Sequence, residues 1–121
     1  MSVDLFKKAL QIEPKNYQLW NKLGATLAHL NEADQAMFCY HRALDLRPNY
    51  VRVWVNLGIA YAHKGEYHEA ARLYLSALNL NPNAKHVWGY LQTTFMCMCK
   101  EVFLIYNLFL HFLILERADL I

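Results

Sequence analysis

A step of 34 residues recurs along this chain and constrains its fold more than any other feature. All of its prolines and all of its tryptophans follow this step, as do leucine, alanine and aromatic series. The series are Pro14, Pro48 and Pro82; Trp20, Trp54 and Trp88; Leu23, Leu57 and Leu91; Ala9, Ala43 and Ala77; and Phe6, Tyr40 and Tyr74. A repeat of this length predicts an array of similar units, each covered only by its neighbours.

Each period contains two segments with apolar residues at helical spacing. Trp20, Leu23 and Leu27 lie on one face of a first helix, and Ala36 and Tyr40 lie on one face of a second. We expect the aromatic series to pack in the core and not to form a cofactor site. Each period therefore predicts a pair of amphipathic helices.

Small and turn-forming residues stand where a pair of antiparallel helices needs them. Gly24 and Ala36 are expected at the helix crossing, where they let one backbone approach the other. Asn31 and Gly65 are expected in the turn between the helices, because Asn and Gly tolerate a left-handed backbone. The proline of each period ends the second helix, because proline lacks an N–H and has a fixed φ.

These patterns predict an all-α, right-handed α-solenoid of two complete repeats with partial repeats on both sides. We assign 1–16 to the second helix of a truncated repeat, 17–50 and 51–84 to complete repeats, 85–99 to the first helix of a partial or capping repeat, and 100–121 to an apolar tail of unknown role. The leading half-repeat has no partner helix, so we expect part of a longer array, with self-association through bare apolar faces.

Composition argues against several classes of function. Hydrophobic residues make up 56% of the 121 residues and charged residues 18%, which is too apolar for a disordered chain. The net charge is +2 and the basic residues are scattered singly, which argues against nucleic-acid binding. The sequence has no phosphate loop, nucleophile motif or paired carboxylates, so we expect no enzyme and no cofactor.

The cysteines indicate a reducing compartment. Cys39, Cys97 and Cys99 are an odd number, and the first thirty residues do not have the layout of a secretory signal. We therefore expect free thiols in a cytoplasmic protein. Cys97 and Cys99 lack a second Cys or His pair at zinc-ligand spacing, so no metal site is predicted.

The first helices of such a solenoid line its inner surface, where extended peptides bind. Inner-facing positions of the two complete repeats hold amides, single cations and small residues. They are Gln18, Asn21, Lys22, Ala25, Ala28 and His29 in one repeat, and Arg52, Val55, Asn56, Ile59, Ala62 and His63 in the next. Amides can hydrogen-bond a peptide backbone and the cations can hold a carboxylate, so this surface suits a peptide C-terminus. A face that is merely solvated is the alternative.

The pattern W-x2-L-G, followed by A-x3-Y-x2-A-x4-P, resembles the tetratricopeptide repeat. The segments NYQLWNKLGATLA (16–28) and YVRVWVNLGIAY (50–61) resemble the C-terminal repeat domain of the peroxin 5 family, the receptors for the type-1 peroxisomal targeting signal. The resemblance covers about residues 3–99. It implies a non-catalytic receptor that binds the C-terminal Ser-Lys-Leu type tripeptide of peroxisomal matrix proteins for import. It also implies a cytoplasmic protein that cycles to the peroxisomal membrane.

The resemblance also implies a set of contacts with the backbone and terminal carboxylate of the tripeptide. The stronger matches are Asn21, Lys22, Arg52 and Asn56, and the weaker ones are His29 and His63. The histidines are weaker because the family tends to carry Asn there and because their charge changes near neutral pH. Earlier repeats, which supply the opposite wall in the family, are absent from this sequence, so we expect weak binding. A generic scaffold or co-chaperone-like interaction module is the alternative function.

The resemblance does not extend to Val102–Leu115, an apolar run whose polar members are Asn107 and His111. Its fourteen residues are fewer than the roughly 17 to 25 that span a bilayer. Three interpretations are open: a sequence that is not the native continuation of the repeats, a helix that covers the last repeat, and a membrane attachment. Membrane contact is therefore expected only indirectly or through 102–115.

Overall fold

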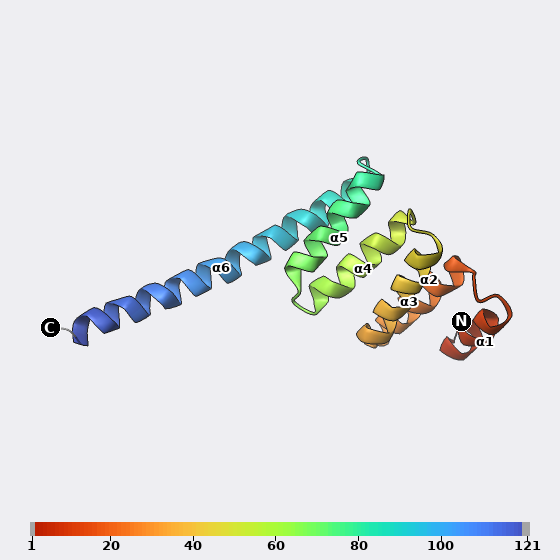
Figure 1. The fold of residues 1–121 in the computed structure, drawn as a ribbon, viewed down its shortest axis with the longest axis horizontal. Coiled ribbons are helices and arrows are strands. Elements are labelled where there is room, and N and C mark those ends of the chain that lie inside the picture. Colours follow the sequence, from red (N-terminus) through yellow and green to blue (C-terminus); the bar gives the residue numbers. More distant parts are fainter. Residues whose placement is uncertain (1, 120–121) are drawn as a thin grey trace.

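The computed structural model describes residues 2–119, and over that range the chain is α-helical without strands. The helices are α1 (Val3–Ile12), α2 (Tyr17–His29), α3 (Ala33–Leu46), α4 (Val51–His63), α5 (Tyr67–Leu80) and α6 (Lys85–Asp119). Helices α2 and α3 form one antiparallel pair and α4 and α5 form the next, and the pairs stand in a row (Figure 1). The predicted all-α solenoid of helix pairs is confirmed.

Glycine permits the close crossing within each pair. A Cβ atom added at Gly24 would lie 2.7 Å from Cε1 of Tyr40, and one added at Gly58 would lie 2.6 Å from Cε1 of Tyr74. Ala36 is fully buried at the same crossing. The tyrosine ring of the second helix therefore occupies the space where a larger residue of the first helix would project, as the repeat pattern predicted.

The turns between paired helices use a left-handed backbone. Asn31 has φ 61° and Gly65 has φ 78°, which confirms the predicted turn residues. One step later Cys99 occupies this position and Gln92 occupies the position of the crossing glycine. Cysteine disfavours a left-handed backbone and glutamine would obstruct a close partner, so the third period has no turn and no returning helix.

A hydrogen bond repeated in all three periods links the proline and tryptophan series. The indole Nε1 of Trp20 donates to the backbone oxygen of Pro14 at 3.0 Å. The equivalent bonds from Trp54 to Pro48 and from Trp88 to Pro82 measure 2.8 and 3.1 Å. Each bond connects the segment after one helix to the first turn of the next helix, which explains why the two residue types recur together.

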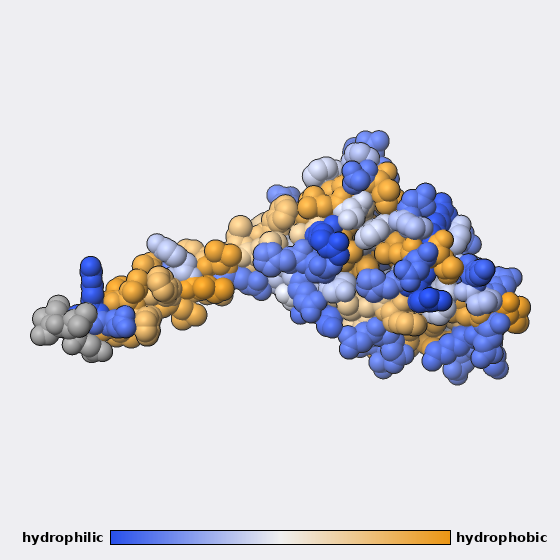
Figure 2. Space-filling model, viewed as in Figure 1, coloured by the Kyte–Doolittle hydropathy of each residue, from blue (hydrophilic) through white to orange (hydrophobic). Residues whose placement is uncertain are grey.

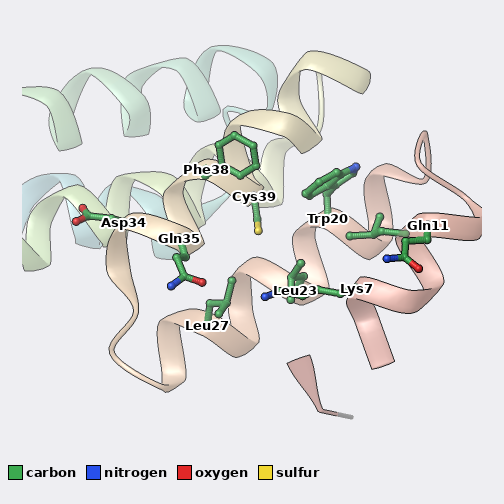
Figure 3. A pocket seen from close by; sticks show the side chains of 10 residues that line it. Lys7, Gln11, Trp20, Leu23, Leu27, Asp34, Gln35, Phe38 and Cys39 are labelled. Atoms are coloured by element: carbon green, nitrogen blue, oxygen red, sulfur yellow. The ribbon is translucent and has the colours of Figure 1, made fainter. Parts of the chain in front are cut away.

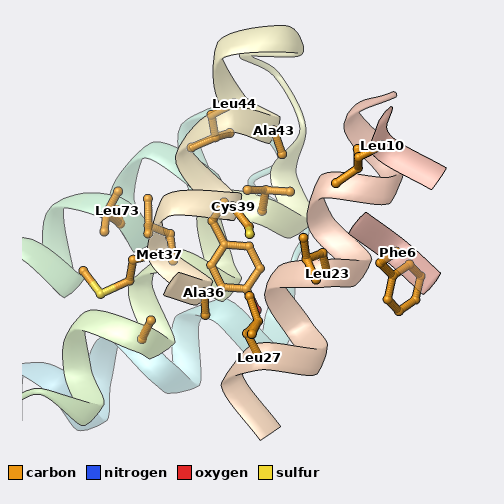
Figure 4. Packing of buried hydrophobic residues seen from close by; sticks show 14 residues of the cluster. Phe6, Leu10, Leu23, Leu27, Ala36, Met37, Cys39, Ala43, Leu44 and Leu73 are labelled. Carbon is orange, nitrogen blue, oxygen red and sulfur yellow. The ribbon is translucent and has the colours of Figure 1, made fainter. Parts of the chain in front are cut away.

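The core runs through the helix pairs as two contiguous clusters. Leu23 and Leu27 of α2 and Phe6 of α1 lie in the first cluster (Figure 4). The same cluster contains Tyr40 of α3. The second cluster joins α5 to the first part of α6 and includes Val55 of α4, so the prediction that Val55 lines the inner surface is wrong. The expectation that every repeated aromatic packs in the core is wrong for Trp88, which is 52% exposed, and within residues 2–119 no second helix follows α6 to cover it.

Helix α6 continues beyond the repeats as a straight projection. Its first part packs against α5, but every residue from Cys99 to Arg117 is exposed. The projection leaves the body of the molecule and carries an apolar surface (Figures 1 and 2). Val102–Leu115 therefore does not cover the last repeat, and that interpretation is wrong. The last two residues of the predicted tail, 120–121, lie outside the described residues.

The three free cysteines are expected to differ in reactivity. Burial raises the pKa of the Cys39 thiol to about 11, so at pH 8 it stays in the unreactive protonated form. Cys99 is exposed on α6. We expect a thiol reagent such as dithionitrobenzoate to modify Cys99 rapidly and Cys39 far more slowly. Mass spectrometry of the labelled peptides measures both rates, and rapid labelling of Cys39 in the folded chain would contradict the expectation.

Candidate peptide-binding groove

A cavity of about 320 Å³ opens between α4 and the preceding helix pair. Its lining comes from the end of α2, the turn after it, the start of α3 and the second half of α4. The lining residues include His29, Asn31, Tyr40, Asn56, His63 and Lys64, with alanines and Ile59 between them. Three of the six predicted site residues, His29, Asn56 and His63, therefore share one cavity.

Two predicted asparagines are joined across neighbouring repeats. Nδ2 of Asn56 on α4 donates to Oδ1 of Asn21 on α2 at 3.0 Å. Nδ2 of Asn21 in turn donates to the hydroxyl oxygen of Tyr50 at 3.4 Å. Asn21 is only 7% exposed, whereas Asn56 is half-buried and borders the cavity. This arrangement orients the Asn56 amide through the buried Asn21.

An aromatic and cationic cluster supports this amide pair from the α3–α4 connection. The rings of Tyr17 and Tyr50 meet edge to face with centroids 5.4 Å apart. The guanidinium of Arg47 lies 5.0 Å from the Tyr17 ring centroid and 5.6 Å from that of Tyr50, and it donates to the Tyr17 hydroxyl at 2.8 Å. Tyr50 thus connects Arg47 to Asn21, and the cluster contributes to the contact between the two complete repeats.

The two predicted cations are placed differently from the amides. Lys22 and Arg52 are both exposed, and neither lines the cavity of His29 and His63. Within the described part of the chain, neither side chain forms an ion pair. Arg52 precedes Asn56 by four residues and Asn56 precedes His63 by seven, so these three residues follow one face of α4. The cations thus remain available to an anionic ligand.

A cation–carboxylate pair borders the cavity. Nζ of Lys64 lies 2.8 Å from Oδ1 of Asp34, and this hydrogen bond, followed by the carboxylate charge, raises the pKa of Lys64. Both side chains are exposed to solvent, so the pair contributes little stability. It nevertheless places a positive group beside His63.

A larger cavity of about 580 Å³ lies on another part of the surface, between α1, α2 and α3. Trp20, Leu23, Leu27, Phe38 and Cys39 give it an apolar wall (Figure 3). None of the predicted site residues lines this cavity. Its polar lining residues include no pair of amides bonded to each other, such as Asn56 and Asn21 beside the smaller cavity. The smaller cavity is therefore the candidate peptide site.

The sequence did not predict a role at the site for Tyr50 or Lys64. Their roles depend on contacts with residues 29 and 30 positions away. The sequence offered one signal for Tyr50: a tyrosine stands at the start of the first helix in each complete repeat, Tyr17 as the first residue of α2 and Tyr50 just before α4.

Across residues 2–119, no group of three or more His, Cys, Asp or Glu side chains could hold a metal ion.

Comparisons with known proteins identify the repeats as tetratricopeptide repeats. Sequence profiles described as tetratricopeptide repeat match residues 5–38 and 51–84, and a profile described as TPR repeat matches residues 26–65. The crystal structure of MamA protein superimposes with a TM-score of 0.76, covering 79% of this chain and 52% of that one, at 19% identity. At that identity the likeness concerns the fold alone.

Curated relatives match over a shorter stretch. The peroxisomal targeting signal 1 receptor of Dictyostelium discoideum is 59% identical over 39 residues, which are 32% of this chain and 6% of the receptor. The peroxisomal targeting signal receptor of Saccharomyces cerevisiae is 42% identical over 41 residues, which are 34% of this chain and 7% of the receptor. The match thus spans less than a tenth of the length of these relatives.

Proposed function

We propose that this chain, which is a tetratricopeptide-repeat protein, binds the C-terminal end of cargo proteins that carry a Ser-Lys-Leu type signal. The observation that carries the proposal is the hydrogen bond between Asn56 and Asn21 beside the cavity of His29 and His63. The similarity to peroxisomal targeting signal receptors supports the type of ligand. In this function the chain performs no chemistry and acts in the cytoplasm, in protein delivery to peroxisomes.

The Asn56 amide is the central contact of this proposal. Asn21 takes one of its N–H groups, which leaves the other N–H and the Oδ1 atom for a peptide backbone. Because Asn21 is itself held by Tyr50, the amide is oriented before the ligand arrives, which lowers the entropic cost of binding. We therefore assign peptide contact to Asn56 and positioning of Asn56 to Asn21.

Lys22 and Arg52 provide the charge that the ligand's carboxylate requires. Hydrogen bonds between a cation and a carboxylate are roughly twice as strong as neutral ones. Arg52 lies on the same face of α4 as Asn56, so one extended peptide could contact both. His29 and His63 supply further donors within the cavity.

The proposal predicts that binding depends on the free carboxylate. A fluorescent peptide ending in Ser-Lys-Leu should bind the full chain, and its C-terminal amide should bind about tenfold or more weakly. Arg52→Ala and Asn56→Ala should each weaken binding of the acid peptide. Fluorescence anisotropy measures all of these affinities.

The matched control for the charge is Lys8→Ala, which removes an exposed cation from α1 and should leave binding unchanged. Equal affinity for acid and amide peptides would overturn the proposal. Binding that persists in the Lys22→Ala, Arg52→Ala double variant would indicate the wider scaffold function instead.

A further inference from the structure

The projecting part of α6 extends a helix face that is buried nearer the repeats. Val87, Leu91 and Thr94 are buried, and they recur every three or four residues along α6. The same spacing passes half-buried Met98 and exposed Glu101 and then continues through Ile105 and Leu108 to Phe112 and Leu115. These four side chains are 66%, 69%, 57% and 53% exposed, because α5 does not extend alongside them. The described chain therefore leaves this face without a partner.

Apolar side chains also occupy the opposite side of the projection. Phe103, Leu110 and Ile114 lie about half a turn away from Leu108 and are likewise exposed. The polar members, Asn107 and His111, are four residues apart and so share one narrow strip. A helix from a second copy would cover only one stripe of this surface. A helix that is apolar on nearly all sides suits an apolar medium that surrounds it.

Charged residues mark both ends of the apolar run. Lys100 and Glu101 precede it, and Glu116 and Arg117 follow it. At 1.5 Å per residue, the 18 residues from Lys100 to Arg117 rise about 27 Å, close to the roughly 27 to 33 Å of hydrocarbon in cellular membranes. The apolar run alone rises only about 21 Å. Long Lys and Arg side chains and local thinning of the bilayer can bridge this difference.

We propose that α6 crosses a lipid bilayer between Lys100 and Arg117 and anchors the repeats to that membrane. Within the described residues, the segment from Lys85 to Arg117 is long and apolar enough to cross a membrane, with none of its apolar window buried. The part before Cys99 packs on α5 and stays outside the bilayer. The anchor does not depend on the peptide groove, and an anchored chain stays on its membrane instead of cycling.

Vesicle flotation of the full chain tests the anchor. Reconstituted with phosphatidylcholine vesicles, the chain should float with the lipid and remain there after an alkaline carbonate wash. The double variant Leu108→Lys, Phe112→Lys should lose most of this flotation. The matched control Leu75→Lys, Leu80→Lys replaces exposed apolar residues of α5, which are 49% and 43% exposed, and should float normally. Circular dichroism confirms that both variants stay helical.

Protease protection distinguishes a span from a helix that lies on the surface. In vesicles with the repeats outside, trypsin should cleave the repeats but spare the bond after Arg117 until detergent opens the vesicles. Cleavage after Arg117 at the same rate with and without detergent would overturn the span. The proposed membrane span would also be overturned if the unaltered chain did not float, for example if it was recovered as a lipid-free oligomer.

Discussion

Replacing Leu57 with alanine is expected to lower the free energy of unfolding by about 2 to 5 kcal/mol. Leu57 on α4 is fully buried and belongs to the cluster that connects the two complete repeats. Its removal leaves a cavity between helix pairs, and each unit of a solenoid is stabilised only by its neighbours. Urea denaturation followed by far-UV circular dichroism measures the change.

Leu75→Ala is the matched control for this prediction. Leu75 lies on α5 and is 49% exposed, so its truncation removes little buried surface. We expect a change within about 0.5 kcal/mol. Equal losses in Leu57→Ala and Leu75→Ala would show that the core does not extend through Leu57 as the structure has it.

The second large effect is expected from Gly58→Ala. The added methyl group would lie 2.6 Å from Cε1 and 2.8 Å from Cδ1 of Tyr74, a residue that is 2% exposed and whose ring stacks on Tyr90. Overpacking of this kind costs about 1 to 3 kcal/mol, although alanine is the better helix former. The melting temperature of the variant should fall below that of the unaltered chain.

Gly89→Ala tests the same substitution where space is available. No atom lies within 4 Å of a Cβ added at Gly89, and the residue is exposed on α6. Here the gain in helix propensity, about 0.5 to 1 kcal/mol, has no opposing contact, so this variant should melt higher. Opposite signs for the two variants are the expected result. A rise in both would mean that the tyrosine ring does not fill the crossing.

The 34-residue step was sufficient to predict the helix pairs and several of the residues that they bury. Leu23, Leu57 and Leu91 are all buried, as their helical spacing required. The turns at Asn31 and Gly65 were equally predictable, because the residue type limits the local backbone. These features depend on neighbours within a few turns of one helix.

The third period shows where the repeat pattern misleads. Trp88 follows the pattern, yet it is half exposed, because no helix among the described residues packs over it. Gln92 and Cys99 replace the two residues that permit a close crossing and a left-handed turn. The helix therefore does not end at Cys99 but continues to Asp119, and the repeats do not cover Val102–Leu115.

The sequence alone determined the repeat, the helices and the amide and cation types that are available for a ligand. Only the tertiary structure decided that Asn21 is buried and bonded to Asn56, and that Lys22 and Arg52 lie outside the cavity. The physical reason is that residues 35 positions apart meet only when two helices pack at a particular offset. Tyr17, Arg47 and Tyr50 also meet at this junction, although Tyr17 lies 30 or more positions from the other two, so no local spacing specifies these contacts.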